Sequence, residues 1–225
     1  MKQVFIVGFG KFGRLALVQG ARRWGKTRVW IVDSRPEALI RQESGFPAGI
    51  GVLADGPQFL TRFQKWIRDD DWIIPALPVH LAWKWLELNL KTRKDRLPLL
   101  PPEDFGSGLP FRQAGNECLY LSYADFLCPE KCPAPAHHCY KTKKKRDLPL
   151  WRFIAEQQGL KGSLGVIESR QIAPGVGGYA FGELRKVRDL ARKSAPPFFM
   201  ATACRCHGVI QGVTWGDKEP AQVTG

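Results

Sequence analysis

Residues 4–13 read VFIVGFGKFG, an apolar run rich in β-branched side chains that leads into three spaced glycines. The run predicts a buried strand, and RLALVQGARRW after it has apolar residues at helical spacing. The glycines therefore stand at a strand-to-helix turn, where each has a use. Gly8 allows the tight turn, Gly10 lets the backbone approach a pyrophosphate, and Gly13 lets the helix pack closely on the strand.

A second predicted strand, RVWIVD, ends at Asp33, twenty residues after Gly13. A carboxylate at this point accepts hydrogen bonds from the adenine ribose hydroxyls and repels a 2′-phosphate. The helix N-terminus offers free N–H groups to phosphate. We therefore predict a dinucleotide site that prefers NAD, with Lys11 and Phe12 inside the motif as further cofactor-binding candidates. Arg35 leaves NADP as the alternative, because a nearby arginine accommodates the extra phosphate.

Strand and helix patterns alternate along the rest of the chain. Further strands are expected at 48–55, 71–77, 118–127, 163–169 and 197–210, with a long connection at 91–116 and a glycine-rich turn at 174–179. This alternation predicts an α/β protein with a doubly wound, mostly parallel sheet and a cysteine-rich insertion loop. Ligands of such sheets bind beyond the carboxyl ends of the strands.

We expect one domain over residues 1–225. Within it, residues 1–90 form the dinucleotide-binding half and residues 148–225 form a C-terminal α/β half. Residues 91–147 are expected to be an irregular, cysteine-rich connection around the fifth strand.

Two cysteine clusters follow predicted strands. The first is CPEKCPAPAHHC at 128–139, which also holds His137 and His138, and the second is CRCH at 204–207. The cysteines are Cys128, Cys132 and Cys139 in the first cluster and Cys204 and Cys206 in the second. If the two strands run parallel to the first strand, both clusters reach the edge of the sheet that binds the nucleotide.

Three interpretations of these cysteines stay open. A metal site would use the first three thiolates with Cys204 or Cys206, either around tetrahedral zinc or around an iron–sulfur cluster. The Cys-Pro pairs favour the cluster, because such a pair ends ferredoxin-like runs. The alternatives are a redox dithiol or disulfide, and unrelated buried thiols. Cys118 lies in a predicted strand and is assigned to the core.

Two further side chains are catalytic candidates. His80 lies between the fourth strand and the next helix, near the expected nicotinamide end, where an imidazole could exchange a proton. Alternatively, it only satisfies a helix N-terminus. Arg170 follows the sixth strand and could hold an anionic substrate beside the glycines of 174–179. Those glycines could cradle a phosphate, or could simply need unusual backbone angles.

The composition restricts partners and compartment. The net charge is +13, spread along the chain apart from the basic run at 141–146. That run lacks interleaved aromatic residues, so a solvated loop is expected, with nucleic-acid binding kept as a third alternative. Six cysteines are too few for a disulfide scaffold. No secretory signal or membrane-spanning run is found, so we expect a cytoplasmic protein with reduced thiols.

The stretches VFIVGFGKFGRLAL, VWIVDSRPEAL and GIGVLADGPQFL resemble the NAD-binding, Rossmann-like N-terminal domain of Trk-type potassium-uptake regulators. The resemblance covers about residues 2–85. It implies nucleotide contacts at the three glycines and Asp33, and it adds Asp55, because a residue at the end of the third strand has this role in the family.

Two functional hypotheses follow. One is an NAD-dependent oxidoreductase with a zinc or iron–sulfur centre beside the nucleotide. The other is a non-catalytic module of the Trk type that senses NAD or redox state. A small molecule or a redox protein is the expected partner, and a homo-oligomer is also open.

Overall fold

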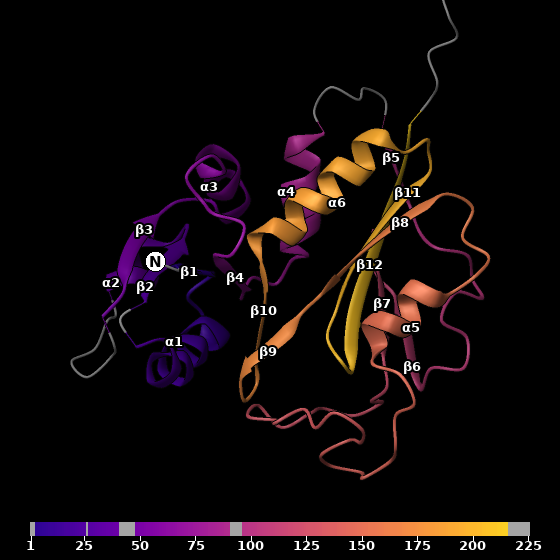
Figure 1. Ribbon diagram of the computed structural model, residues 1–225, viewed down its shortest axis with the longest axis horizontal. Helices are drawn as coiled ribbons and strands as arrows, with labels where there is room; N and C mark the ends of the chain where they lie inside the picture. Colours follow the sequence, from indigo (N-terminus) through magenta and orange to yellow (C-terminus); the bar gives the residue numbers. More distant parts are fainter. Residues whose placement is uncertain (1–2, 26, 41–47, 91–95, 216–225) are drawn as a thin grey trace, which may run out of the picture.

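The computed structural model describes residues 3–25, 27–40, 48–90 and 96–215. Within these residues the chain builds two six-stranded sheets, each with parallel and antiparallel pairs. Figure 1 shows the two sheets on opposite sides of the molecule, with helices α4 and α6 between them. The predicted α/β class is therefore found, but as two mixed sheets.

The first sheet has the strand order β3-β2-β1-β4-β10-β9. Its first four strands in this order are parallel, and β10 and β9 extend it in antiparallel fashion. The strands are β1 (Gln3–Val7), β2 (Arg28–Asp33), β3 (Ile50–Leu53), β4 (Trp72–Pro75), β9 (Arg170–Ala173) and β10 (Val176–Ala180). The helices connecting its parallel strands are α1 (Lys11–Trp24), α2 (Pro36–Ile40) and α3 (Gly56–Phe63).

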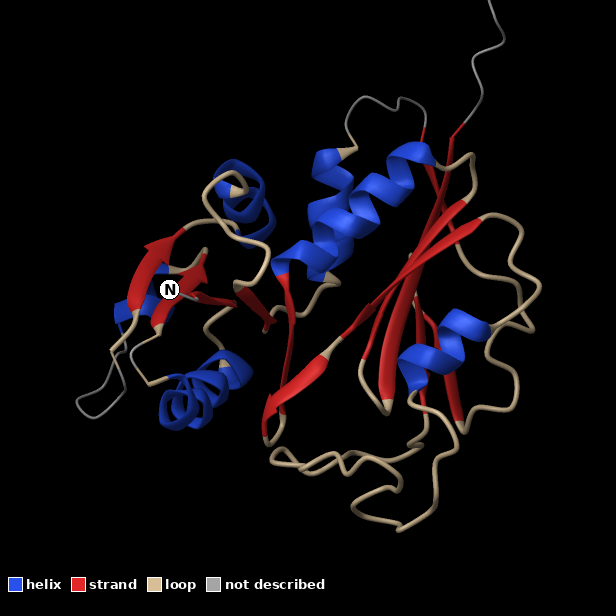
Figure 2. Ribbon diagram, in the orientation of Figure 1, coloured by secondary structure: helices blue, strands red, loops and turns tan. Residues whose placement is uncertain are grey.

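The second sheet has the order β6-β7-β12-β11-β8, with β5 also paired to β12. Its strands are β5 (Arg96–Leu99), β6 (Phe111–Ala114), β7 (Leu119–Ser122), β8 (Ser163–Glu168), β11 (Phe198–Ala203) and β12 (His207–Trp215). The remaining helices are α4 (Leu81–Asn89), α5 (Leu150–Glu156) and α6 (Phe181–Lys193). The segment between β7 and α5 has neither helix nor strand and runs below both sheets in Figure 2.

The prediction of a doubly wound, mostly parallel sheet is wrong. Only β1, β2, β3 and β4, together with the pair β8–β11, are parallel among the described strands. The other neighbours are antiparallel, and two of these pairs, β9–β10 and β11–β12, are joined by loops of two and three residues. A parallel crossover needs about a dozen residues or more, so loops this short allow only hairpins.

Three elements differ from the sequence expectation for local reasons. The predicted single strand 197–210 is the hairpin β11–β12, and its turn holds Cys204 and Cys206. The predicted turn at 174–179 is largely strand β10. The connection at 91–116 contains β5 and β6, which pair with β12 and β7. Residues 91–95 of that connection lie outside the described residues.

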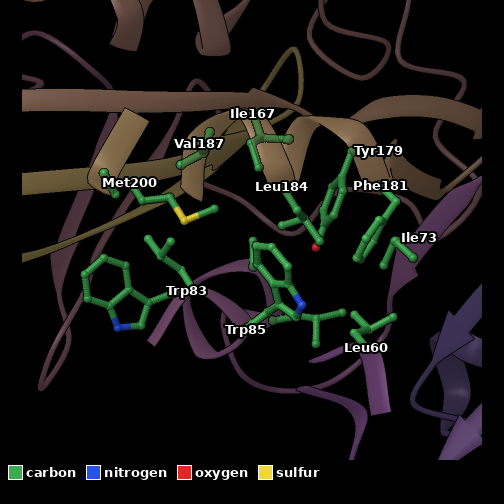
Figure 3. Close-up of a cluster of buried hydrophobic side chains, with 14 of the residues drawn as sticks. Leu60, Ile73, Trp83, Trp85, Ile167, Tyr179, Phe181, Leu184, Val187 and Met200 are labelled. Atoms are coloured by element: carbon green, nitrogen blue, oxygen red, sulfur yellow. The ribbon is translucent and has the colours of Figure 1, made fainter. Parts of the chain in front are cut away.

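The main core lies between the two sheets. In β1, Phe5 and Val7 face this core, while Val4 and Ile6 pack against α1 on the other side. Figure 3 shows Trp85, Tyr179 and Phe181 among aliphatic residues of both sheets. The rings of Trp85 and Phe181 meet edge to face, with centroids 5.6 Å apart. This core fixes the position of one sheet relative to the other, and with it the loops at their edges.

Among the described residues, no helix combines the length and the apolar character needed to cross a bilayer.

Candidate functional site

The glycine loop, residues 8–13, lies between the ends of three parallel strands. The Gly8 N–H donates to the Val32 carbonyl at 2.8 Å, and the Ala76 N–H donates to the Val7 carbonyl at 2.8 Å. Gly8 has φ +97°, and a Cβ on it would lie 2.6 Å from the Ala76 oxygen. A left-handed residue in so close a contact must be glycine. A Cβ on Gly13 would lie 2.0 Å from the Gly8 oxygen, which explains the close packing of α1.

Gly10 is different, because the fold does not require a glycine there. Its φ is −77°, and the nearest atom to an added Cβ would be Nη2 of Arg35 at 3.9 Å. Gly10 is also the N-cap of α1, whose first turn has no acidic residue and no side-chain cap. An open approach to an uncapped helix N-terminus is the arrangement that admits a phosphate.

Asp33 is buried against the glycine loop with both carboxylate oxygens engaged. Oδ2 accepts from the Phe9 N–H at 2.6 Å, and Oδ1 accepts from the Arg35 N–H at 2.9 Å. The Arg35 guanidinium also donates to both oxygens. Although burial acts in the opposite direction, these hydrogen bonds lower the pKa of Asp33. Asp33 is therefore a carboxylate whose two oxygens already have protein donors, and a ligand hydroxyl could bind it only by displacing the Arg35 side chain.

The other three residues predicted to contact the nucleotide, Asp55, Phe12 and Lys11, lie in three different environments. Asp55 is exposed and caps α3, accepting from the Gln58 N–H at 3.0 Å. Phe12 is 57% exposed and lines the cavity described below. Lys11 forms an ion pair with Glu130, which lies between the first two cysteines of the cysteine loop (residues 128–146). The glycine loop and the cysteine loop are therefore in direct contact.

The two sheets bring the cysteine clusters to one place. Because β7 and β11 are both antiparallel to β12, they run in the same direction and their carboxyl ends share one edge of the second sheet. Cys128 follows β7, and Cys204 directly follows β11. The convergence that we predicted is therefore found, but at an edge of the second sheet.

A cavity of about 750 Å³ lies at this edge and is here called the cysteine pocket. Its lining includes Phe12 from the glycine loop and Gly175 from the β9–β10 hairpin. The sulfur-bearing residues that line it are Cys128, Cys132, Cys139, Cys204 and Cys206. Its volume is within the range of small-molecule and cofactor sites, about 300–1,000 Å³. Cys118 is not part of the lining.

Backbone N–H groups point at three of these sulfurs. Cys204 Sγ accepts from the N–H groups of Cys206 and His207 at 3.4 and 3.3 Å. Cys132 Sγ accepts from the Ala134 N–H at 3.4 Å. Cys139 Sγ accepts from the Thr142 N–H at 3.5 Å. Backbone donors of this kind commonly surround the sulfur ligands of metal centres.

The thiols have different pKa values because their surroundings differ. Burial, followed by repulsion from neighbouring thiolates, raises the pKa of Cys128, and it raises the pKa of Cys206 to about 12. For Cys139, burial is outweighed by hydrogen bonds from Thr142 and Lys141, so its pKa is lowered. Arg146 offsets part of the repulsion, since its guanidinium donates to Cys206 Sγ and to the carbonyls of Pro135 and His138.

His207 is a site residue that the sequence reasoning did not include among the ligands. Its Nε2 lies 3.3 Å from Cys128 Sγ, and its Nδ1 lies 2.9 Å from Ser122 Oγ. Burial, followed by the charge of Arg146, lowers the pKa of His207, so the ring is neutral at neutral pH. In the sequence, His207 is visible as the last residue of CRCH, but only the fold shows that it lies beside Cys128.

The described residues contain no group of three histidine, cysteine or acidic side chains already arranged to hold a metal ion. The donor types nonetheless suit soft or borderline metals, because five thiols and one neutral imidazole surround the same cavity. Because no three of these side chains are yet arranged around one point, they would have to close around a metal ion as it binds.

The two catalytic candidates stand outside the lining of the cysteine pocket. His80 donates from Nδ1 to Gln211 Oε1 and accepts at Nε2 from the Thr202 hydroxyl, both at 3.0 Å. Burial lowers the pKa of His80 to about 4. Arg170 is exposed and pairs with Glu168 at 2.9 Å. Both side chains therefore have protein partners that account for their positions.

The basic run at 141–146 forms the far side of the cysteine loop, and its residues 144–146 line the pocket. The Lys141 ammonium lies 4.5 Å from the centre of the Phe126 ring, and Lys143 lies 4.9 Å from that of Tyr140. Each ring thus has an ammonium over one face, where a base would stack. This arrangement gives no support to nucleic-acid binding.

The chain is similar to a protein family and to an archaeal protein whose descriptions name no activity. A protein-family model described as "Uncharacterized protein, C-terminal domain" matches residues 81–216. A protein of Archaeoglobus fulgidus described as "Uncharacterized protein" is 33% identical over 222 residues, which cover 91% of this chain and 96% of that protein. The matched C-terminal region includes all five pocket cysteines.

Proposed function

We propose that this chain binds NAD(H) and holds a thiolate-ligated metal centre beside it. The chain belongs to the family described as "Uncharacterized protein, C-terminal domain". The observation that carries the proposal is the lining of the cysteine pocket, which joins Phe12 of the glycine loop to all five clustered cysteines. A dinucleotide on the glycine loop and a metal in the pocket would therefore be neighbours.

The nucleotide half of the proposal rests on Gly10 and Asp33. Gly10 has space around it that the protein does not fill, and it stands at an uncapped helix N-terminus. A pyrophosphate there would accept hydrogen bonds from the first turn of α1 and gain from the helix dipole. The strands β3-β2-β1 have the order of one half of a dinucleotide-binding sheet, and β4 lies beside β1 as the fourth strand of such a sheet does.

The metal half rests on the donor set. Cys128 and His207 would supply a sulfur and a nitrogen ligand, and the remaining positions would come from Cys132, Cys139, Cys204 and Cys206. Zinc would act as a Lewis acid or a structural ion, whereas an iron–sulfur cluster would supply one-electron chemistry. The six cysteines are free, which suits a reducing compartment such as the cytoplasm.

A second candidate is a non-catalytic sensor of NAD(H) or redox state. It is favoured by the positions of His80 and Arg170, which are engaged by Gln211, Thr202 and Glu168 and do not line the pocket. A sensor needs two coupled binding sites and no acid–base pair.

The oxidoreductase, by contrast, would need a small-molecule or protein redox partner that approaches the cysteine pocket.

The test is purification of the full chain without oxygen, followed by metal and sulfide analysis, an absorption spectrum and a fluorescence titration with NADH. Stoichiometric metal together with saturable NADH binding supports the proposal. Brown colour with acid-labile sulfide identifies a cluster, and a colourless zinc protein excludes electron transfer by the metal. NADH oxidation with artificial acceptors separates enzyme from sensor. A protein that binds neither metal nor NADH would refute the proposal.

A further inference from the structure

We propose that the metal site and the nucleotide site are coupled through residues 129–132, with the Lys11–Glu130 ion pair as the contact that changes. The inference rests on the proposed function and adds regulation to it. Metal in the pocket is expected to increase the affinity for NAD(H), and NAD(H) is expected to increase the affinity for the metal by the same factor.

One end of the connection is at the glycine loop. Lys11 is in the first turn of α1, beside Gly10, where a pyrophosphate would lie. Its ammonium pairs with the carboxylate of Glu130, and the two side chains are 69% and 55% exposed. A lysine engaged by a carboxylate is less available to a phosphate. An exposed pair of this kind is weak, so a competing ligand can replace it easily.

A second anchor holds the same segment on the β9–β10 hairpin of the first sheet. The Cys132 carbonyl accepts from the Gly175 N–H at 3.1 Å and from Gln171 Nε2 at 2.6 Å. The backbones are in close contact, because a Cβ on Gly175 would lie 1.6 Å from the backbone carbonyl oxygen of Glu130. Cys128 and Cys132 therefore flank a segment that is attached to the first sheet.

The opposite wall of the cysteine pocket belongs to the second sheet. Cys204 and Cys206 lie in the β11–β12 turn, and His207 begins β12. No three potential ligands in the described residues are yet arranged around an ion. Cys128 already lies 3.3 Å from His207 across the pocket, so the ligand that is missing is a third one. A metal that takes Cys132 as this ligand would draw residues 129–132 toward the β11–β12 turn. That movement would pull Glu130 from Lys11 and leave the ammonium free for the phosphates.

The size of the coupling follows from the ion pair. Exposed pairs change an equilibrium by about fivefold at most. We therefore expect the dissociation constant of NADH to be about two- to fivefold lower in the metal-loaded protein than in the chelator-treated protein. Glu130→Gln should give the stripped protein the NADH affinity of the loaded one, because Lys11 is then free in both states.

The experiment is a fluorescence titration with NADH of six samples of the full chain: wild type, Glu130→Gln and Glu183→Gln, each zinc-loaded and stripped. Glu183→Gln is the matched control, since it removes a similarly exposed ion pair, with Lys186 on α6. A lower dissociation constant in loaded wild type, absent in Glu130→Gln and kept in Glu183→Gln, supports the coupling.

Equal NADH affinities in loaded and stripped wild type would overturn the coupling while leaving both binding sites in place. A difference that persists unchanged in Glu130→Gln would overturn the role of the ion pair. A protein that fails to bind zinc or NADH in any sample would refute the proposed function, and the coupling with it. A titration of zinc against a chromophoric chelator, with and without NADH, checks the reciprocal effect in the same samples.

Discussion

Cys128 and His207 face each other at the edge of the second sheet, with Sγ 3.3 Å from Nε2 across 79 residues of chain. Two ligands of one tetrahedral zinc ion, at about 2.3 Å for sulfur and about 2.0 Å for nitrogen, stand roughly 3.5 Å apart. The pair is therefore spaced as two ligands of one ion would be. The Ser122 hydroxyl at Nδ1 fixes the orientation of the imidazole, as the second partner of a metal-binding histidine commonly does.

The first prediction concerns metal affinity. His207→Ala and Cys128→Ser should each weaken zinc binding by at least about tenfold, because each removes one ligand of the expected set. Competition with a chromophoric chelator measures this. Cys118→Ser is the control, since Cys118 is a cysteine outside the pocket lining and its replacement should leave zinc affinity unchanged. Unchanged affinity in His207→Ala would remove this histidine from the metal site.

The second prediction separates folding from binding at the glycine loop. Gly10→Ala should lower the melting temperature only slightly, because the nearest atom to the new Cβ is 3.9 Å away and the remaining cost is that of a poorer N-cap. It should nonetheless weaken NADH binding at least tenfold, since the methyl group would occupy the approach of the pyrophosphate. Gly8→Ala should instead destabilise the protein by about 1–3 kcal/mol, because of its positive φ and the contact with Ala76. Full NADH affinity in Gly10→Ala would contradict the nucleotide site.

The first four strands could be predicted from sequence because their signals are local. Val4 to Val7 form a continuous apolar run, and the helices between these strands show apolar residues at helical spacing. The hairpins gave no such signal, because packing requires glycines inside their strands, and those at 174–179 were interpreted as a turn. A Cβ on Gly178 would lie 2.7 Å from the Ile73 oxygen, and one on Gly212 would lie 2.4 Å from the Phe199 ring.

The site was predictable in part for the same reason. The cysteines and the glycine motif are visible as residue types at short spacings. Their convergence depends on strand direction, and the expected direction was wrong for the second sheet, although β7 and β11 still end at one edge. The contacts of Lys11 with Glu130 and of Arg146 with Cys206 join residues far apart in sequence, and no local pattern indicates them.

The third prediction concerns Asp33. Asp33→Asn should lower the free energy of unfolding by about 1–3 kcal/mol, because the amide cannot accept all the hydrogen bonds that the buried carboxylate receives. Urea denaturation at pH 7 measures this. Asp55→Asn is the control, since asparagine caps a helix about as well as aspartate does.

The pH dependence of Asp33 has a defined sign. Its pKa is lowered in the folded protein, so the stabilisation is present above the unfolded value of about 3.9 and is lost as the pH falls through the folded value. The difference between wild type and Asp33→Asn should therefore shrink below about pH 4. A difference that stays constant down to pH 3 would show that the charge of Asp33 does not stabilise the fold.

The last prediction concerns His80, which links the start of α4 to both β11 and β12 through Thr202 and Gln211. Burial lowers its pKa from 6.5 to about 4, so the folded protein holds the neutral ring where the unfolded chain takes up a proton. The stabilisation is therefore complete above about pH 6.5 and declines as the pH falls toward 4, by up to about 1.4 kcal/mol per pH unit. Urea midpoints between pH 7.5 and 4.5 measure the decline.

The decline should be smaller in His80→Gln, which cannot be protonated, and unchanged in His137→Gln, whose histidine is exposed. Equal slopes in wild type and His80→Gln would mean that His80 is already solvated and protonated in the folded protein.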